Sequence, residues 1–246
     1  MGPDPTSMLG FDKTDAIAMT INQQRLDQYI TNGHHGVRGW FAGNQLDMFL
    51  IADKLQKELN IPGGVGEIGV HHGRLFLLLM LLRRAGERAI AMDVFDLQEF
   101  NTDFSGLGDL NAFLSNVDTH VGSRDLLEIV KADSMQLDPA DVIALNEGKR
   151  LRMISVDGSH TTHNIANDLK IAHRLLQPGG IIVVDDYFNG GCPMVAEGVA
   201  RFIILEPVVN IVPVLAGCNK VVFTTKSYHK QYLEAYRSLV VDSTAG

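Results

Sequence analysis

The chain contains little of several features that would have assigned it to a special class. Its 246 residues include only two cysteines, Cys192 and Cys218, so no disulfide framework is indicated and a reducing compartment fits. Acidic residues outnumber basic ones by 29 to 21, and the formal charge of −8 argues against nucleic acid or an anionic membrane as the main partner. The longest apolar run, residues 75–82, is far shorter than the roughly 20 residues that cross a bilayer.

The N-terminus also lacks the pattern of a secretory signal, because its first residues are acidic and proline-rich. These features together predict a cytoplasmic protein. The chain has 46% hydrophobic and 20% charged residues, which is ordinary for a globular protein with a sizeable core. Its length allows one large α/β domain or two small ones.

Strand and helix patterns alternate from Gly63 onward. Runs of apolar and β-branched residues predict strands at 64–70, 89–94, 127–131, 152–156, 181–185, 208–214 and 220–225. Helical spacing predicts helices at 73–85, 109–117, 140–146, 163–176 and 194–204. The last two strands are joined by a short turn, which indicates an antiparallel hairpin. We therefore expect one doubly wound α/β domain over residues 63–246.

Residues 1–62 are expected to form an N-terminal helical extension or cap. Residues 12–30 and 44–59 carry helical spacing. Between them, residues 31–43 are rich in glycine and histidine and hold the only tryptophan, Trp40. Such a composition is typical of a lid over a substrate, and equally of a simple connector.

Two strands in the second half of the chain each end in acid. Residues 154–156 run into Asp157, residues 181–184 run into Asp185 and Asp186, and the helix between them is expected to close in a turn at 177–180. In a right-handed βαβ unit both acidic ends fall on the sheet edge where open α/β sheets bind ligands. Three carboxylates there can hold a hard divalent cation or perform acid–base chemistry. A simpler alternative makes Asp185 and Asp186 a helix-capping pair.

The first three strands also end in residues that suit a ligand. A glycine-rich turn with Glu67, Gly69, His71 and Gly73 follows the first strand, without the spacing of a dinucleotide fingerprint. It is consistent with close approach to a ligand or with a purely structural turn.

The acid Asp93 ends the second strand, where it could accept hydrogen bonds from a ribose diol, and a solvated loop aspartate is the alternative. The polar residues Asp133 and Ser134 follow the third strand, where an adenine could be recognised. Three successive strand ends thus favour a nucleoside ligand.

In these motifs the chain resembles the class I S-adenosylmethionine-dependent methyltransferases, and most of all the metal-dependent small-molecule O-methyltransferases that include sugar and natural-product enzymes. The resemblance covers residues 63–225. Its most specific parts are residues 154–160, 168–169, 176–180 and 184–187. It implies a seven-stranded, mostly parallel sheet with strand order 3-2-1-4-5-7-6 and strand 7 antiparallel.

The resemblance also implies roles for the residues at the strand ends. Glu67 and Gly69 would border the methionine part of S-adenosylmethionine, in a cofactor loop that includes His71 and Gly73. Asp93 would bind its ribose, and Asp133 with Ser134 its adenine. The implied ligands of a Mg²⁺ ion, with Mn²⁺ or Ca²⁺ as substitutes, are Asp157, Asp185 and Asp186.

A general base is expected near the acceptor hydroxyl, and His160, three residues beyond Asp157, is our candidate because histidine titrates near neutrality. Related sugar enzymes often carry an acid where this chain has Ser159, so that assignment does not carry over. His163 is expected to face solvent or to line the acceptor pocket, and Tyr187 with Phe188 to form a wall of it. Asn164 and Asp168 fit capping and helix-surface roles.

The predicted function is metal-assisted methyl transfer to a hydroxyl of a small polar metabolite, such as a sugar, a glycosylated natural product or a phenol. The N-terminal extension and the terminal hairpin are candidate surfaces for a homo-oligomer. One alternative is a nicotinamide-dependent oxidoreductase, disfavoured by the missing dinucleotide fingerprint. A second is a non-catalytic nucleoside-binding protein that kept the fold.

Overall fold

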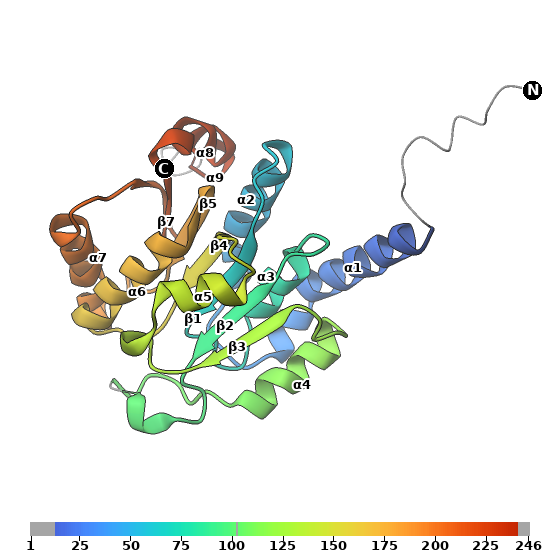
Figure 1. Cartoon of the computed structure of the whole chain (residues 1–246), viewed down its shortest axis with the longest axis horizontal. Helices are drawn as coiled ribbons and strands as arrows, with labels where there is room; N and C mark the ends of the chain where they lie inside the picture. Colours follow the sequence, from blue (N-terminus) through green and yellow to red (C-terminus); the bar gives the residue numbers. More distant parts are fainter. Residues whose placement is uncertain (1–12, 102, 241–246) are drawn as a thin grey trace, which may run out of the picture.

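The computed structural model describes residues 13–101 and 103–240. A single seven-stranded sheet forms its centre, with strand order β3-β2-β1-β4-β5-β7-β6 (Figure 1). Neighbouring strands are parallel except for the β5–β7 and β6–β7 pairs. The predicted strand order and the antiparallel strand 7 are confirmed. The strands are β1 Gly64–Ile68, β2 Ala89–Asp93, β3 Leu127–Lys131, β4 Leu151–Val156, β5 Leu176–Val184, β6 Ile211–Gly217 and β7 Lys220–Thr225.

Helices cover both faces of this sheet. The α-helices are α1 Lys13–Thr31, α2 Leu46–Glu58, α3 Phe76–Leu82, α4 Leu110–His120, α5 Pro139–Leu145, α6 Thr162–Leu175, α7 Pro193–Leu205, α8 His229–Ala235 and α9 Arg237–Val240. Short 3₁₀ turns are η2 Gly33–Gly36, η3 Gly43–Gln45, η4 Gln98–Phe100, η5 Ser134–Gln136 and η6 Lys226–Tyr228. Side-chain caps mark several helix starts: Asp109 caps α4, Asp138 caps α5 and Thr161 caps α6.

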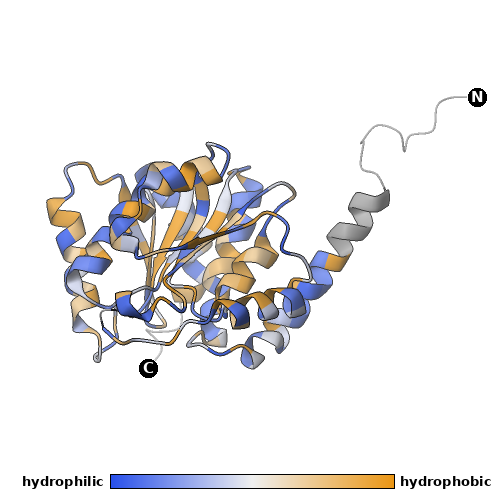
Figure 2. Ribbon diagram, turned by 60° about the horizontal axis from the view of Figure 1, so that its bottom comes forward, coloured by the Kyte–Doolittle hydropathy of each residue, from blue (hydrophilic) through white to orange (hydrophobic). Residues whose placement is uncertain are grey.

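The two faces of the sheet form two cores. Helices α1, α2, α3, α4 and α8 cover one face, while α5, α6 and α7 cover the other. Along β5, Ile181 and Val183 belong to the first core and Ile182 and Val184 to the second. Burial on both faces explains why this strand is continuously apolar instead of alternating. Figure 2 shows the apolar strands between helices whose polar sides face outward.

Several predicted boundaries are wrong: the strand expected at 208–214 is β6 at Ile211–Gly217, and the helix expected at 73–85 is the shorter α3 at Phe76–Leu82. Residues 177–180, expected to close the helix in a turn, belong to β5, which begins at Leu176. Long-range hydrogen bonds hold this segment in the sheet: the Gly179 amide donates to Thr225 Oγ1 at 2.9 Å and the Tyr232 hydroxyl donates to the Gly179 carbonyl at 2.7 Å. The helices α8 and α9, which follow the hairpin, were not predicted.

A buried ion cluster ties α2 to the sheet. The Arg152 side chain is fully buried on β4 and pairs with Asp53 of α2 at 3.1 Å and with Glu87 at 3.0 Å. It also donates a hydrogen bond to Gln56 at 2.8 Å. Because a buried guanidinium requires such partners, this cluster fixes α2, and with it the preceding loop, against the sheet.

The glycine- and histidine-rich segment 31–43 is built into the structure. It contains η2, whose His34 is buried, with Nδ1 3.0 Å from the Tyr29 carbonyl oxygen. Its Phe41 shares a core with the sheet. The division at residues 62 and 63 stays a prediction, and Asp12, at the predicted start of the first helix, lies outside the described residues.

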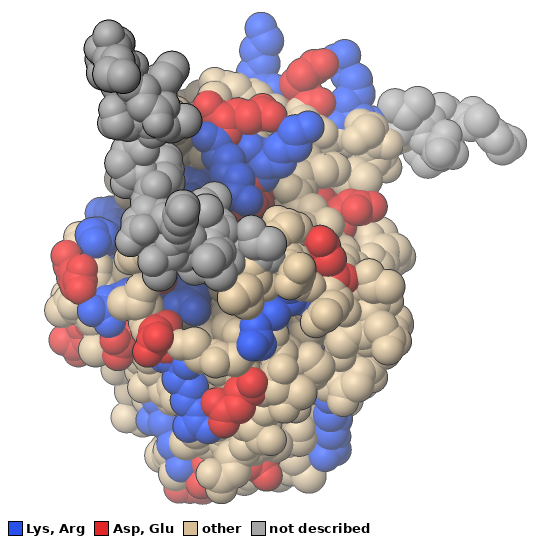
Figure 3. Space-filling view, turned by 90° about the vertical axis from the view of Figure 1, so that its right-hand side faces the viewer, with Lys and Arg blue, Asp and Glu red and all other residues tan. Residues whose placement is uncertain are grey.

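Two surface properties bear on partners. Among the helices in the described part of the chain, none has both the length and the apolarity needed to cross a membrane. On the face shown in Figure 3, basic and acidic side chains are interspersed, without a large field of one sign.

Candidate functional site

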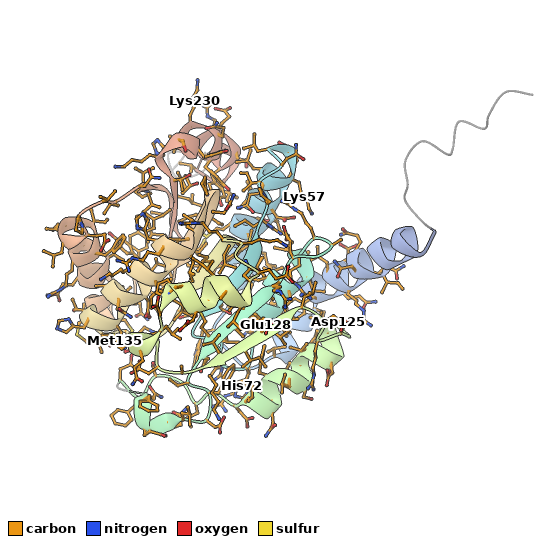
Figure 4. All side chains as sticks on the ribbon, in the orientation of Figure 1. Lys57, His72, Asp125, Glu128, Met135 and Lys230 are labelled. Carbon is orange, nitrogen blue, oxygen red and sulfur yellow. The ribbon has the colours of Figure 1, made fainter. Side chains whose placement is uncertain are left out.

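A cavity of about 500 Å³ lies at the carboxyl edge of the sheet. This edge can be located in Figure 4 from the labelled residues around β3. Asp125 and Glu128 lie at the amino end of β3, and Met135 lies on the other side, beyond its carboxyl end. Loops after β1 to β5 line the cavity together with Trp40. The structure brings together nine of the predicted site residues on its wall: Gly69, His71, Asp93, Asp133, Ser134, Asp157, His160, Asp185 and Asp186.

The loop after β1 depends on Gly69. Its φ is +89°, and a Cβ at this position would overlap the Asp157 backbone carbonyl. The missing side chain therefore lets the loops after β1 and β4 meet, which places Asp157 beside the cavity. Gly73 does not line the cavity; it packs against Phe113, which indicates a structural role.

Glu67 lies behind this loop, in a smaller chamber that adjoins the cavity. Its side chain is 1% exposed, and its Oε2 atom has no hydrogen-bond partner among the described residues. Burial first, and the nearby Asp157 second, raise the pKa of Glu67 well above its ordinary value. The unpartnered Oε2 atom of this buried carboxyl group calls for a hydrogen-bonding or cationic ligand.

The wall formed by the loops after β2 and β3 suits a nucleoside. Asp93 accepts hydrogen bonds from the backbone amides of His71, at 2.7 Å, and of Phe95. Burial raises the pKa of Asp93. The His71 ring lies 5.4 Å from that of Trp40, and burial lowers the pKa of His71 to about 4, so its ring is neutral. Asp133 caps η5 by accepting a hydrogen bond from the Met135 amide.

His160 is held between two carboxylates. Its Nδ1 lies 3.0 Å from Asp103 Oδ2, and its Nε2 lies 2.9 Å from Asp186 Oδ2. The hydrogen bond to Asp186 is the main cause that raises the pKa of His160 to about 9. The pKa of Asp186 falls to about 2, because of His160 and the amides of Asn189 and Asn219. In this arrangement the imidazole is protonated at neutral pH.

Asp103 itself is anchored by its own loop. Burial alone would raise its pKa, but hydrogen bonds from Ser105 and from the His160 backbone amide lower it. Asp103 is therefore a carboxylate that accepts a hydrogen bond from Nδ1 of His160. This contact orients the ring so that its Nε2 faces Asp186 at the cavity wall.

The other two predicted metal ligands differ in their surroundings. The buried Asp185 forms an ion pair with the Lys220 ammonium, which is itself 1% exposed. Burial, followed by the charge of Asp185, raises the pKa of Asp157 well above its ordinary value. Burial and the neighbouring Asp185 thus both disfavour the ionised form of Asp157.

Potential ligand atoms within 4.8 Å of one another occur, among the described residues, in the group of His160, Asp186 and Cys192. The predicted set of Asp157, Asp185 and Asp186 is not that close. The alternative in which Asp185 and Asp186 cap the next helix is wrong, because α7 begins at Pro193 with Cys192 as its N-cap.

The structure also tests the positions predicted for other residues around the site. Asp168 is not on a helix surface: it is fully buried, and its carboxylate lies beneath Gly158. Asn164 lines the cavity, His163 is exposed, and Tyr187 and Phe188 are not part of the cavity wall. Residues that sequence reasoning missed are Asp103, Lys220, Asn189, Cys192 and Asn219.

The strand order of the sheet is that of the class I methyltransferase fold, and the cavity lies at its carboxyl edge. Residues 67–187 match a family model described as a methyltransferase domain. This match covers 121 of the 246 residues and identifies a methyltransferase domain within the chain. A search of curated protein sequences finds no significant match.

Solved structures support this fold. The O-methyltransferase NovP has a TM-score of 0.66 at 13% identity, covering 83% of this chain and 99% of its own. CalS11, a TDP-rhamnose 3′-O-methyltransferase of calicheamicin biosynthesis, has a TM-score of 0.54 at 17% identity, covering 90% and 99%. The S-adenosylhomocysteine-bound methyltransferase PaMTH1 of Podospora anserina has a TM-score of 0.55 at 14% identity, covering 89% and 99%.

Proposed function

We propose that the chain transfers the methyl group of S-adenosylmethionine to a hydroxyl oxygen of a small, polar, uncharged metabolite with the help of a divalent cation. The observation that carries the proposal is one continuous cavity whose wall joins the predicted nucleoside-binding residues to the acidic cluster. The structural relatives named above as O-methyltransferases favour oxygen as the accepting atom.

The cavity fits the cofactor in size and in chemistry. Its volume of about 500 Å³ lies in the range of small-molecule sites. Asp93 would accept the ribose hydroxyls, and Asp133 with Ser134 would face the adenine. The unpartnered Glu67 Oε2 suits the methionine ammonium. Gly69 and the neutral His71 would line the path between these parts.

The acidic cluster fits a divalent cation in its donor atoms. Asp157, Asp185 and Asp186 would hold the ion. To do so, Asp185 would give up its ion pair with Lys220. Support comes from the three carboxyl groups that share the cavity wall; burial first, and the charge of Asp185 second, raise the pKa of Asp157 among them. Such an ion supplies Lewis-acid polarisation of the acceptor hydroxyl. Mg²⁺ is the natural candidate for an oxygen-only set, and Mn²⁺ or Ca²⁺ could replace it.

His160 is the proposed proton acceptor. Asp103 fixes its Nδ1, and its Nε2 points toward Asp186 at the cavity wall. While both carboxylates pair with it, the ring stays protonated and cannot accept a proton. His160 can therefore act as base only when Asp186 is engaged by another cation, which couples the base to the proposed metal ligand.

The charge of the cavity restricts the acceptor. No lysine or arginine lines it among the residues that the structure describes, whereas Asp93, Asp133, Asp157, Asp185 and Asp186 do. Phosphate or diphosphate groups are bound by cations, so this wall favours an uncharged sugar, glycoside or phenol over a sugar nucleotide.

Methyl transfer from labelled S-adenosylmethionine to a panel of catechols, phenols and neutral glycosides, with Mg²⁺ and with EDTA, tests the proposal. We expect transfer that EDTA abolishes. The Asp185→Ala variant should lose this activity while its S-adenosylmethionine affinity stays within a few-fold. Transfer that survives EDTA would remove the metal from the account, and cofactor binding without transfer to any acceptor would favour the non-catalytic alternative.

A further inference from the structure

Cys192 lines the cavity beside His160 and Asp186, and the proposed methyl transfer gives it no role. A ring nitrogen of His160, a carboxylate oxygen of Asp186 and the Cys192 sulfur all lie within 4.8 Å of one another. All three are half-buried residues of the cavity wall. They form a mixed set of one nitrogen, one oxygen and one sulfur atom.

The composition of this set differs from that of the three aspartates proposed for Mg²⁺. Magnesium and calcium take oxygen ligands, whereas a thiolate selects softer ions. Zinc binds histidine nitrogen, aspartate oxygen and cysteine sulfur, and open zinc sites use three protein ligands with water at a fourth position. The atoms around Cys192 therefore suit a transition-metal ion of the zinc type.

Neighbouring side chains orient two of the three ligand atoms. Asp103 accepts a hydrogen bond from His160 Nδ1 at 3.0 Å, and Nε2 faces Asp186 Oδ2 at 2.9 Å. The side-chain amides of Asn189 and Asn219 donate to the other oxygen of Asp186, Oδ1, at 3.0 and 2.6 Å. Metal-bound histidines almost always donate their second ring N–H to a carboxylate, carbonyl or water in this way. Nε2 and Oδ2 are thus the atoms that face a shared ion.

The third ligand atom needs only a small movement. Zinc lies about 2.0–2.3 Å from its ligands, so two tetrahedral ligands lie roughly 3.3–3.8 Å apart. The Cys192 sulfur must therefore approach the other two atoms by no more than roughly 1.5 Å. The Cys192 amide donates to the Asn189 carbonyl at 2.9 Å, and the Asn189 amide donates to the Asp186 carbonyl at 3.1 Å. The backbones of both ligands are thus held within one short loop.

We propose that His160, Asp186 and Cys192 form a site that binds Zn²⁺ and that zinc in this site inhibits methyl transfer. Zinc binding displaces the protons of His160 Nε2 and of the thiol. A zinc-bound Nε2 has no lone pair for the proton of the acceptor hydroxyl, so His160 cannot act as the base. Asp186 belongs to both ligand sets, so Zn²⁺ also competes with Mg²⁺ for it. The inhibition rests on the proposed function, whereas zinc binding does not.

Titration with Co²⁺, a spectroscopic substitute for Zn²⁺, tests the site without cofactor or acceptor. Cobalt with a thiolate ligand gives a sulfur-to-cobalt charge-transfer band in the near ultraviolet. We expect this band in wild type, saturating at one Co²⁺ per chain and disappearing when Zn²⁺ is added. Cys192→Ser should lose the band and bind Co²⁺ at least about tenfold more weakly, since even an outer partner of a metal ligand is typically worth about 10- to 100-fold in affinity.

Cys218→Ser is the matched control, because Cys218 is the other cysteine of the chain and is exposed in the turn between β6 and β7. It should keep the wild-type band and affinity. Asp103→Asn keeps all three ligands, so it should retain the band at saturation while Co²⁺ binding weakens by about 10- to 100-fold. The absence of the band in wild type, or a band that Cys192→Ser retains, would overturn the site.

Methyl transfer in saturating Mg²⁺ with added Zn²⁺ tests the inhibition. We expect zinc to abolish transfer by wild type and by Cys218→Ser, and Cys192→Ser to require at least about tenfold more zinc for half inhibition. Transfer by wild type that continues after zinc has displaced cobalt from the site would overturn the inhibitory role. A wild type that shows the cobalt band but transfers no methyl group without zinc would contradict the proposed function and support the metal site alone.

Discussion

The Lys220 ammonium and the Asp185 carboxylate form a buried ion pair between β7 and β5, at the edge of the sheet that carries the cavity. Because β7 runs antiparallel to β5, the first residue of β7 meets the residue that follows β5. The chain therefore supplies one cation to its own acidic cluster. Asp157, Asp185 and Asp186 all line the cavity.

Replacing Lys220 by methionine should destabilise the protein, because it leaves the Asp185 carboxylate buried without its partner. Loss of one member of a buried pair typically costs about 3–5 kcal/mol. Urea unfolding without metal should show this loss. If Asp185 can exchange the ammonium for a metal ion, Mg²⁺ should restore part of the stability of Lys220→Met.

Lys226→Met is the matched control, since Lys226 is exposed just beyond the same strand. Its free energy of unfolding should stay within about 0.5 kcal/mol of wild type. An equally small effect of Lys220→Met would show that the pair does not hold the cluster together.

Asp103→Asn should lower the turnover number without changing cofactor affinity. The carboxylate fixes Nδ1 of His160, and loss of such a supporting partner typically costs about 10- to 100-fold in activity. Steady-state kinetics of the Mg²⁺-loaded enzyme would measure this, together with the dissociation constant of S-adenosylmethionine. Asp103→Glu should recover part of the rate.

Asp96→Asn, in the same connection between β2 and α4, serves as control because Asp96 is paired with Lys131 at the surface. A parallel loss of cofactor affinity in Asp103→Asn would assign Asp103 to the loop's structure and not to the positioning of His160.

Asp168 should make stability depend on pH. Burial raises the pKa of Asp168 to about 7, so the folded state favours the protonated carboxyl. The resulting stabilisation is complete below the unfolded pKa of about 4 and is lost as the pH rises through about 7. Asp168→Asn is neutral at every pH. The free energy of unfolding of Asp168→Asn minus that of wild type should therefore rise by roughly 2–3 kcal/mol from pH 5 to pH 8.

Urea titrations at both pH values would measure the difference, with the exposed Asp125→Asn as reference. A difference between wild type and Asp168→Asn that does not change with pH would mean that Asp168 is ionised in the folded protein throughout this range.

The acidic cavity should discriminate against charged acceptors. We expect the complex with S-adenosylhomocysteine to bind thymidine diphosphate no more tightly than thymidine, because carboxylates line the wall and no described lysine or arginine does. Calorimetric titration with both probes measures this. Tighter binding of the diphosphate by about tenfold or more would indicate an anion site and favour sugar-nucleotide acceptors.

The alternation of strands and helices predicted the fold well because central strands such as β2 and β5 are buried on both faces, and their residues 89–92 and 181–184 are therefore continuous apolar runs. The start of β5 was missed because contacts from Thr225 and Tyr232, distant in sequence, draw residues 177–180 into the sheet. The proline and glycines of residues 177–180 are typical of a turn, and the local sequence therefore predicted one there.

Within the site, acids at the ends of parallel strands could be predicted, since those ends share one edge of the sheet. The presence of Lys220 in the site could not be predicted, because Lys220 starts an antiparallel strand. It reaches Asp185 through the register of β7 against β5. Asp103 lies in a long connection after β2, where no periodicity locates a side chain.

The central claim is that carboxylates after β4 and β5 hold a divalent cation beside the cofactor. Electron paramagnetic resonance of Mn²⁺ titrated into the S-adenosylhomocysteine complex tests it most directly. The account predicts one bound ion per chain in wild type, displaced by Mg²⁺, and a strong loss of affinity in Asp157→Asn. The absence of a bound ion in wild type, or binding that Asp157→Asn leaves unchanged, would contradict it.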